Sequence, residues 1–262
     1  MTKLNIITVW YNEEINLPKL FKSLEYIKSK IEIRHIYVDQ SSIDNSTNIA
    51  KENWCEIYVH ENKWYADPDK KWIVENLLNN EDWCLILDCD EEITKELSDE
   101  IIININNNKF DIFNIYIESI IFWWFGSKSY WYRLFKKSWV KLTNEIHNYI
   151  NLISNKIWYL KNNILNNDLK YLWNEIKVLT EKMNRYSSIE IEKIWNIWKH
   201  KIIFFIFWKP IQRFFGFWII HKQFLRWIKW IILCFIISNY QFLIYAKLYE
   251  KYFINKSYEK II

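Results

Sequence analysis

Apolar stretches of two different periods alternate along the first part of the chain. Short β-rich runs predict strands at Leu4–Val9, Ile33–Val38, Glu56–Val59 and Cys84–Asp88. Between them, apolar residues at helical spacing predict helices at Asn12–Lys30, Asp67–Asn79 and Ile93–Asn107. A further helix follows the polar turn Asp39–Ser46 and ends at about Asn53. Strands and helices in this order predict an α/β fold, a mostly parallel sheet with flanking helices. Ligands of such a sheet bind at the carboxyl ends of its strands.

A different pattern follows in the second half. Phe113–Glu118 and Tyr132–Phe135 predict later strands, and Leu169–Lys199 predicts further helix. From Lys193 to Tyr249 the chain has seven Lys and two Arg but no acidic residue, which gives this segment a formal charge of +9. The whole chain carries +4, so the remainder carries 4 − 9 = −5. We therefore predict a catalytic domain at 1–198 and a basic, aromatic, helical C-terminal region at 199–262.

This C-terminal region fits an anionic membrane surface better than a nucleic acid, because its basic residues are interleaved with long apolar runs. Its longest uncharged run, Trp230–Ala246, has 17 residues, whereas a membrane span needs about 20. We therefore expect helices that lie in the plane of the membrane, and no nucleic-acid partner. An aromatic-rich layer packed on the body of the protein is the alternative.

The cysteines and the N-terminus favour a cytoplasmic location. The four cysteines form no C-x-x-C pair, which argues against a disulfide framework or structural zinc. Met1–Val9 lacks the features of a signal peptide. We expect a cytoplasmic protein bound peripherally to the inner face of the cell membrane.

Glycine and tryptophan occur in unusual numbers. The chain has 2 Gly and 17 Trp, whereas average usage gives about 18 Gly. An AT-rich genome depletes glycine, but it should also deplete tryptophan, whose codon UGG is G-rich. We hypothesise that many of these tryptophans are glycines encoded by UGA, which some bacterial lineages read as glycine.

Acidic residues follow the fourth predicted strand directly. Asp88 and Asp90 are two positions apart, so on an extended backbone their side chains point the same way. Two convergent carboxylates suit Mg²⁺ or Mn²⁺, which would neutralise the charge of a leaving diphosphate. The alternative is that these acids, Glu91 and Glu92 above all, favour the N-terminus of the next helix.

Two further strand ends carry polar residues, in the segments Tyr11–Glu14 and Asp39–Asp44. Each alone fits a helix N-cap. Together with Asp88 they give three acid-bearing strand ends on one side of the sheet. Such an edge could hydrogen-bond a base and a ribose while a metal holds the diphosphate.

The order of these motifs resembles the family 2 glycosyltransferases, in particular the branch of lipopolysaccharide-core and related envelope sugar transferases. The matching segments are Tyr11–Glu14, Val38–Asp44, Asp82–Glu91, Arg133–Lys136, Ile146–His147, Lys182–Ser187 and Gln241–Leu248. The resemblance implies a GT-A fold, a nucleotide-sugar donor, a divalent metal and inversion at the anomeric carbon.

The resemblance also implies roles for individual residues. Asp39 would bind the nucleobase, Glu13 the nucleotide, and Arg133 would lie near the diphosphate or the acceptor. Asp88 and Asp90 would hold the metal and the diphosphate. The full donor-binding set is Tyr11, Asn12, Glu13, Asp39, Ser42, Asp88 and Arg133.

The chain departs from the family pattern at two places. Pro68-Asp69-Lys70 stands where the family often has Gln, Arg or Lys, and Asn. Asn148 follows His147, where the family commonly has Glu, and Asn cannot take a proton from the acceptor hydroxyl. Glu145 is then the first candidate for the base and His147 the second, although His147 could equally make a structural hydrogen bond.

The family usually has glycine where this chain has Trp64, Trp227 and Trp230, and Trp139 also fits a turn glycine. By contrast, Trp83 stands where the family often has a tryptophan.

The sequence therefore predicts a metal-dependent inverting glycosyltransferase that moves a sugar from a nucleotide-sugar donor to a glycolipid or envelope saccharide. A nucleotidyltransferase on a similar sheet is one alternative, although its Gly-rich phosphate loop is not visible. A catalytically degenerate, membrane-bound adaptor is the other.

Overall fold

The computed structural model describes residues 3–121, 124–143, 150–167, 175–194, 199–220 and 227–254. It divides into two compact units, Met1–Leu172 and Trp173–Ile262. The helix that precedes residue 198 thus groups with the C-terminal helices. The boundary between a catalytic domain and a tail at 198/199 stays a prediction.

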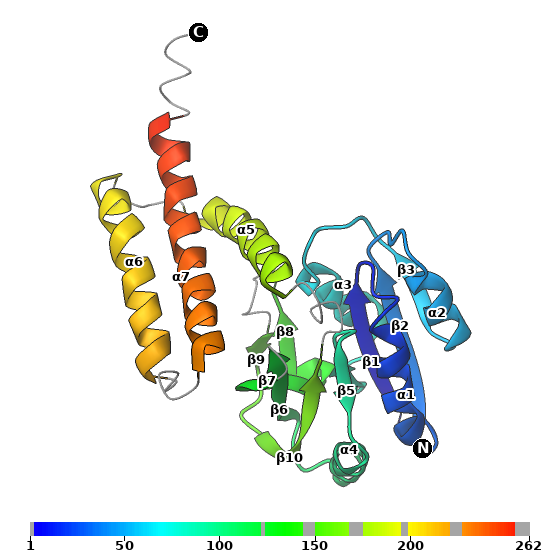
Figure 1. Cartoon of the computed structure of the whole chain (residues 1–262). Helices are drawn as coiled ribbons and strands as arrows, with labels where there is room; N and C mark the ends of the chain where they lie inside the picture. Colours follow the sequence, from blue (N-terminus) through cyan, green and yellow to red (C-terminus); the bar gives the residue numbers. More distant parts are fainter. Residues whose placement is uncertain are drawn as a thin grey trace. The chain divides into compact units, whose positions relative to one another are not determined.

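The first unit is built on one eight-stranded sheet (Figure 1). Its strands are β1 (Lys3–Trp10), β2 (Glu32–Asp39), β3 (Glu56–Val59), β4 (Trp83–Ile86), β5 (Glu91–Ile93), β6 (Ile112–Ile121), β7 (Trp124–Lys136) and β10 (Ile157–Asn166). They lie in the order β3-β2-β1-β4-β7-β6-β10-β5. Neighbours from β3 to β4 are parallel, β7 is antiparallel to β4 and β6, β10 is parallel to β6, and β5 is antiparallel to β10. The predicted α/β fold is confirmed.

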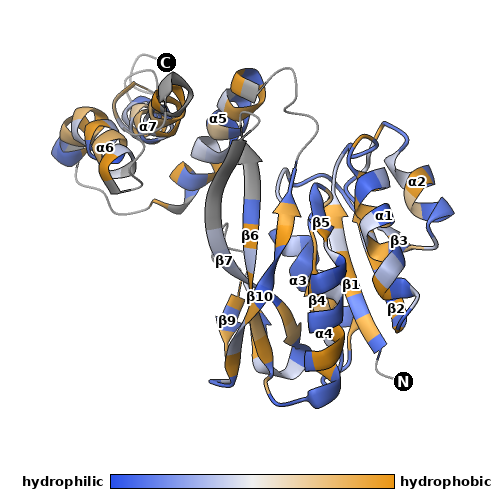
Figure 2. Ribbon diagram, turned by 60° about the horizontal axis from the view of Figure 1, so that its bottom comes forward, coloured by the Kyte–Doolittle hydropathy of each residue, from blue (hydrophilic) through white to orange (hydrophobic). Residues whose placement is uncertain are grey.

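Helices flank both faces of this sheet. They are α1 (Leu17–Lys28), α2 (Ser46–Glu52), α3 (Asp67–Leu77) and α4 (Lys95–Asn107). One apolar cluster joins the sheet to α1, α2 and α4, and a second joins it to α3 and to the hairpin β8 (Val140–Leu142) and β9 (Ile150–Leu152). Figure 2 shows the strands β1 and β4 as largely hydrophobic between more polar helix surfaces. A sheet covered on both faces needs such apolar strands.

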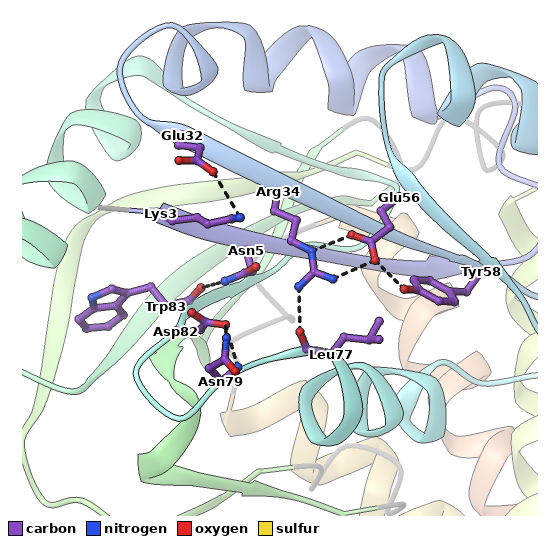
Figure 3. Close-up of polar contacts among 10 residues, drawn as sticks. All are labelled: Lys3, Asn5, Glu32, Arg34, Glu56, Tyr58, Leu77, Asn79, Asp82 and Trp83. Atoms are coloured by element: carbon purple, nitrogen blue, oxygen red, sulfur yellow. Dashed lines mark hydrogen bonds and ion pairs between the residues drawn. The ribbon is translucent and has the colours of Figure 1, made fainter. Parts of the chain in front are cut away.

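The amino-terminal edge of the sheet is closed by structural contacts (Figure 3). The Arg34 guanidinium donates two hydrogen bonds to the Glu56 carboxylate, at 2.7 and 2.8 Å, and a third to the Leu77 carbonyl at 2.8 Å. Asn5 Nδ2 donates to the Trp83 carbonyl at 3.0 Å. The Arg34 hydrogen bonds thus join β2 to β3 and to the end of α3, and the Asn5 hydrogen bond joins β1 to β4.

The structure differs from the prediction after β4. This strand ends at Ile86 rather than Asp88, and α4 begins at Lys95, where Thr94 accepts a capping hydrogen bond. Glu91–Ile93 forms the short strand β5, paired with the distant strand β10. The helix N-terminus interpretation of Glu91 and Glu92 is therefore wrong. Three residues are too few to show the alternation of apolar and polar positions that predicts a strand. This strand is defined only by its pairing with β10.

Two tryptophans have a left-handed backbone that favours glycine. Trp54 has φ 60° and Trp64 has φ 66°, and their side chains are 93% and 54% exposed. Trp54 follows the end of α2 in a Schellman arrangement, because its amide bonds the Lys51 carbonyl and the Cys55 amide bonds the Ala50 carbonyl. Glycine is the usual residue at this position, which supports the recoding hypothesis. Trp139 lies in a 3₁₀ turn without positive φ.

We expect Trp54→Gly to stabilise the protein by about 1 kcal/mol, because a bulky residue in the left-handed region costs roughly 1–2 kcal/mol. Urea unfolding measures this, with the exposed Val59→Gly as a control that should destabilise. The coding DNA tests the hypothesis directly: UGG at codons 54 and 64 would refute it there.

The second unit is helical, as predicted for the C-terminal region. It contains α5 (Glu175–Lys193), α6 (Lys199–Ile220) and α7 (Trp227–Tyr249), and α6 lies beside α7 (Figure 1). The Lys247 ammonium of α7 donates to the Asn184 carbonyl and to the hydroxyls of Ser187 and Ser188, at 2.6 to 2.8 Å. Two segments that carry the family resemblance therefore bind each other, and Lys247 holds α7 on α5.

Candidate functional site

The loops after β1 and β2 lie side by side at the carboxyl edge of the sheet. The Asn12 amide donates to Ser42 Oγ at 2.9 Å, and the Asn12 side-chain oxygen accepts from the Ile43 amide at 2.9 Å. The Glu13 amide donates to Ser46 Oγ at 2.6 Å. The structure thus brings the predicted residues Asn12 and Ser42 together, and both bind the neighbouring loop.

Asp39 ends β2 and is 2% exposed. Its Oδ2 accepts hydrogen bonds from the Ser42 amide at 3.1 Å and from Thr47 Oγ1 at 3.0 Å. Its Oδ1 is buried and has no hydrogen-bond partner within the described part of the chain. Because a buried acceptor without a partner is costly, this oxygen is suited to an N–H or O–H group of a ligand.

The other predicted residues of the β1 loop frame the same edge. Glu13 is 2% exposed, and its Oε2 accepts from Asn16 Nδ2 at 2.6 Å. The Tyr11 ring lies edge-on to the Trp64 ring, with 6.0 Å between the ring centroids. Trp64 therefore stands beside a predicted donor-binding residue as well as on a strained backbone.

Asp88 lies at the centre of a buried charge cluster. Its Oδ1 accepts from Lys70 Nζ at 2.6 Å, and its Oδ2 accepts from Arg133 Nη2 at 3.1 Å. The side chains of Lys70 and Arg133 are only 5% and 7% exposed, whereas that of Asp88 is 25% exposed. Although burial opposes ionisation, the two cations hold the pKa of Asp88 well below its usual range. Asp88 is therefore a carboxylate at neutral pH.

A β-bulge positions Arg133. In the β6–β7 pairing, Leu134 faces Phe113 and Tyr132 faces Asn114, so Arg133 is the extra residue. Bulges redirect side chains and are common beside active sites. At this bulge, the Arg133 guanidinium donates hydrogen bonds to both Asp88 and Glu91.

Glu91 completes the cluster. Its Oε1 accepts from Arg133 Nη2 at 2.7 Å, and its Oε2 accepts from the Asp88 amide at 2.8 Å. Residues 88–91 form a turn, since the Glu91 amide also donates to the Asp88 carbonyl at 3.1 Å. The expectation of an extended backbone from Asp88 to Asp90 is wrong. The turn instead brings Glu91 back to Asp88.

The titration of Glu91 gives a pH prediction. Burial, together with the charges of Asp88 and Asp90, raises the pKa of Glu91 from 4.5 to about 8, although Arg133 opposes this. The folded protein then keeps a proton that the unfolded chain loses. This contribution to stability is full below about pH 4.5 and is lost as the pH rises through about 8.

We therefore expect the free energy of unfolding to fall with rising pH in this window, by at most about 1.4 kcal/mol per unit from this group. Urea unfolding of the wild type and Glu91→Gln across the window measures it. The extra slope should vanish in the variant, and equal slopes would contradict the assignment.

Sequence reasoning missed Lys70 and Asp69, which lie where the family pattern is broken. Asp69 is fully buried and accepts from Gln40 Nε2 at 2.7 Å, while its Oδ1 lies 2.9 Å from His60 Nδ1. Gln40 Nε2 also donates to the Tyr65 carbonyl at 3.0 Å. Asp69 therefore anchors the segment from His60 to Tyr65 on the end of β2. In the sequence, the only sign of these two residues was that Pro68-Asp69-Lys70 departs from the family motif.

The carboxylates at this edge are of the type that a divalent cation binds together with a phosphate ligand, and the cation itself stays a prediction. The described residues contain no cluster of three or more His, Cys, Asp or Glu that could hold a metal by itself. Asp90 is half-buried in the turn that follows Asp88. Mg²⁺ commonly binds one or two carboxylates together with substrate phosphates and water, which Asp88 and Asp90 could provide.

The predicted acceptor bases Glu145 and His147 lie outside the described residues, as does Asn148. Their roles stay predictions.

Comparisons with known proteins point to one class. An uncharacterized glycosyltransferase of Rickettsia typhi is 27% identical over 72% of this chain and 66% of its own length. One from Rickettsia prowazekii is 31% identical, over 38% of this chain and 32% of its own. This chain thus spans less than two thirds of these relatives. No protein-family model matches it.

Solved structures agree on the fold. S. aureus TarS gives a TM-score of 0.50 at 17% identity, over 86% of this chain and 46% of TarS. This chain has a glycosyltransferase fold. TarS 1–349 in complex with UDP also gives 0.50, at 15% identity, over 96% of this chain and 93% of that one. The relatives and the fold matches are thus glycosyltransferases, and this chain is similar to the first in sequence and to the second in fold.

Proposed function

We propose that this protein is a glycosyltransferase that moves a sugar from a nucleotide-sugar donor bound at the carboxyl edge of β1, β2 and β4. The observation that carries the proposal is the buried Oδ1 of Asp39, which has no hydrogen-bond partner among the described residues. Asp39 ends β2, and the cations Lys70 and Arg133 meet at Asp88, which follows β4, two strands along the sheet. A nucleobase offers N–H donors, and a diphosphate attracts cations. The fold match solved with UDP supports this donor class.

In this proposal Asp39 receives the base, and Glu13 and Tyr11 border the nucleotide. Lys70 and Arg133 lie against Asp88 in the free protein and move part of their hydrogen bonding to the diphosphate, whose charge grows as the sugar leaves. Arginine suits this role because its forked donors match phosphate oxygens. Mg²⁺ or Mn²⁺ held by Asp88 and Asp90 would supply further charge neutralisation.

We further propose that the acceptor is a glycolipid or envelope saccharide and that the reaction inverts the anomeric carbon. Inversion requires a base for the acceptor hydroxyl, for which Glu145 and then His147 are the candidates. The lipopolysaccharide branch of family 2 remains the proposed context.

Hydrolysis of UDP-sugars by the purified protein, with Mg²⁺, with Mn²⁺ and with chelator, tests the proposal. We expect metal-dependent release of UDP that Asp90→Ala lowers by about a hundredfold or more. Turnover unaffected by chelator and by Asp90→Ala would contradict the metal assignment. If the protein turns over no nucleotide-sugar, the enzyme proposal is contradicted and the catalytically degenerate, membrane-bound adaptor is favoured.

We propose that the C-terminal helices bind an anionic membrane peripherally. Helix α6 exposes apolar side chains spaced four positions apart, Ile203, Phe207, Ile211, Phe215 and Ile219, each 47–68% exposed. The basic residues Lys201 and Arg213 are exposed on the same helix. Among the described helices, the stretch Ile231–Ile254 is also long and apolar enough to cross a membrane, although α7 packs on α5 and α6.

Flotation with liposomes of anionic lipid tests this surface. We expect the wild type to float, Phe207→Glu with Ile211→Glu to lose most binding, and high salt to weaken it. As a control, Phe242→Glu changes an exposed residue of α7 and should matter less. Equal binding by neutral and anionic liposomes would contradict the electrostatic part.

A further inference from the structure

Three tyrosines form a continuous row across neighbouring strands of the first unit, here called the tyrosine ladder. Tyr116 of β6 stands directly opposite Tyr130 of β7, with 5.3 Å between ring centroids. Tyr130 also contacts Tyr159 of β10 at 5.3 Å. Tyr130 and Tyr159 are 55% and 54% exposed. The rings are thus within attractive range of one another, yet two of them offer much of their surface to solvent.

The ladder lies on one face of the sheet. Phe113, Ile115 and Ile117 of β6 belong to the buried cluster that includes α1 and α4. Because side chains alternate along a strand, Asn114 and Tyr116 point to the opposite face. An isolated exposed aromatic needs no explanation, but adjoining ones on a single face form a surface suited to a ligand.

The register of the sheet places the ladder and Asp88 toward the same edge of the sheet. Leu85 of β4 and Phe113 of β6 both pair with Leu134 of β7. Tyr116 follows Phe113 by three residues, as Asp88 follows Leu85. Both strands run antiparallel to β7, so Tyr116 and Asp88 both lie beyond the level of Leu134, toward the carboxyl ends of their strands, and β4 and β6 are two strands apart. The ladder therefore continues the proposed donor edge, on the side away from Asp39.

A buried amide beside the ladder has an open hydrogen-bonding position. Asn114 pairs in register with Tyr132 on one side and Tyr159 on the other. It is 5% exposed, and its Oδ1 has no hydrogen-bond partner within the described residues. Such an oxygen is costly unless a donor reaches it, and a ligand hydroxyl is a suitable donor.

We infer that the tyrosine ladder and Asn114 form the acceptor subsite, and that the acceptor group bound there is a saccharide ring. A pyranose has an apolar C–H face, which suits the electron-rich face of an aromatic ring, and a rim of hydroxyls, one of which reaches Asn114 Oδ1. Aromatic walls with few polar groups are usual in small-molecule sites. This inference rests on the proposed function and narrows its acceptor to the sugar part of the molecule.

The test uses three neutral trisaccharides as probes: maltotriose, cellotriose and chitotriose. Their binding to the full chain is measured by calorimetry, with and without UDP. We expect at least one to bind, and Tyr130→Ala and Tyr159→Ala to weaken it about tenfold or more, which is about 1.4 kcal/mol. Tyr159→Phe keeps the ring and should retain most of the affinity.

Trp158→Ala is the matched control. Trp158 neighbours Tyr159 on β10 and is 49% exposed, but it points to the other face, where it stacks on Phe110 at 4.9 Å. Cross-strand aromatic pairs also stabilise sheets, so each variant is checked by thermal unfolding. If an alanine variant unfolds, Tyr130→Leu and Tyr159→Leu replace it. Asn114→Leu should raise the melting temperature and lower trisaccharide affinity.

The outcomes are separable from the proposed function. If none of the trisaccharides binds the wild type, or if Trp158→Ala loses as much affinity as the ladder variants, the inference is overturned. UDP affinity should be unchanged in every ladder variant. A wild type that binds a trisaccharide through the ladder but never binds UDP or hydrolyses a UDP-sugar would instead overturn the donor proposal.

Discussion

Asp88→Asn should lower UDP-sugar turnover by about a hundredfold or more and destabilise the protein by roughly 3 kcal/mol. The change leaves Lys70 and Arg133 buried without their shared carboxylate, and removal of one partner from a buried ion pair costs about 3–5 kcal/mol. We take the lower end because the Asp88 side chain is a quarter exposed. Turnover falls because the charges that would face the diphosphate lose their arrangement.

A control and a second variant separate these two effects. Glu81 pairs with Lys136 at 3.4 Å, but its side chain is 81% exposed. Glu81→Gln should therefore change stability by no more than about 0.5 kcal/mol. Asp88→Asn combined with Lys70→Gln should regain part of the stability without regaining turnover. Full activity in the double variant would contradict a role for this cluster in the reaction.

Asp39→Asn should weaken UDP binding by about tenfold to a hundredfold with little loss of stability. Asparagine keeps one oxygen for the Ser42 amide and the Thr47 hydroxyl, so the start of α2 stays held. Its NH₂ group then replaces the unpartnered Oδ1, and a donor faces the N–H of the base. Hydrogen bonds to charged groups contribute about 1.5–3 kcal/mol, which gives the expected range.

Calorimetry with UDP measures this effect, and thermal unfolding checks the fold. Asp44→Asn is the control, because Asp44 is half-buried in the same loop and accepts hydrogen bonds from the Glu14 amide and from Ser46. It should leave UDP affinity nearly unchanged. An Asp39→Asn protein that binds UDP as tightly as the wild type would remove Asp39 from the nucleotide site.

The periodic segments of the chain could be located from the sequence. The strands at the start, β1 to β3, and the helices α1 to α3 depend on local apolar spacing, and their bounds agree within a few residues. Short or irregular elements could not be located. β5 has three residues and exists only through its pairing with β10, and the bulge at Arg133 exists only through the pairing of β6 with β7.

The candidate site divides in the same way. The sequence by itself determined that Asp39 and Asp88 follow apolar strands, because strand ends are marked by a local change from apolar to polar residues. Only the tertiary structure decided which partners they meet. Lys70, Arg133 and Glu91 come from separate elements and reach Asp88 through strand order, a bulge and a turn. The oxygens of Asp39 and Asn114 without partners are likewise defined only once every neighbour is in place, because hydrogen-bond satisfaction belongs to the folded surroundings and not to the local sequence.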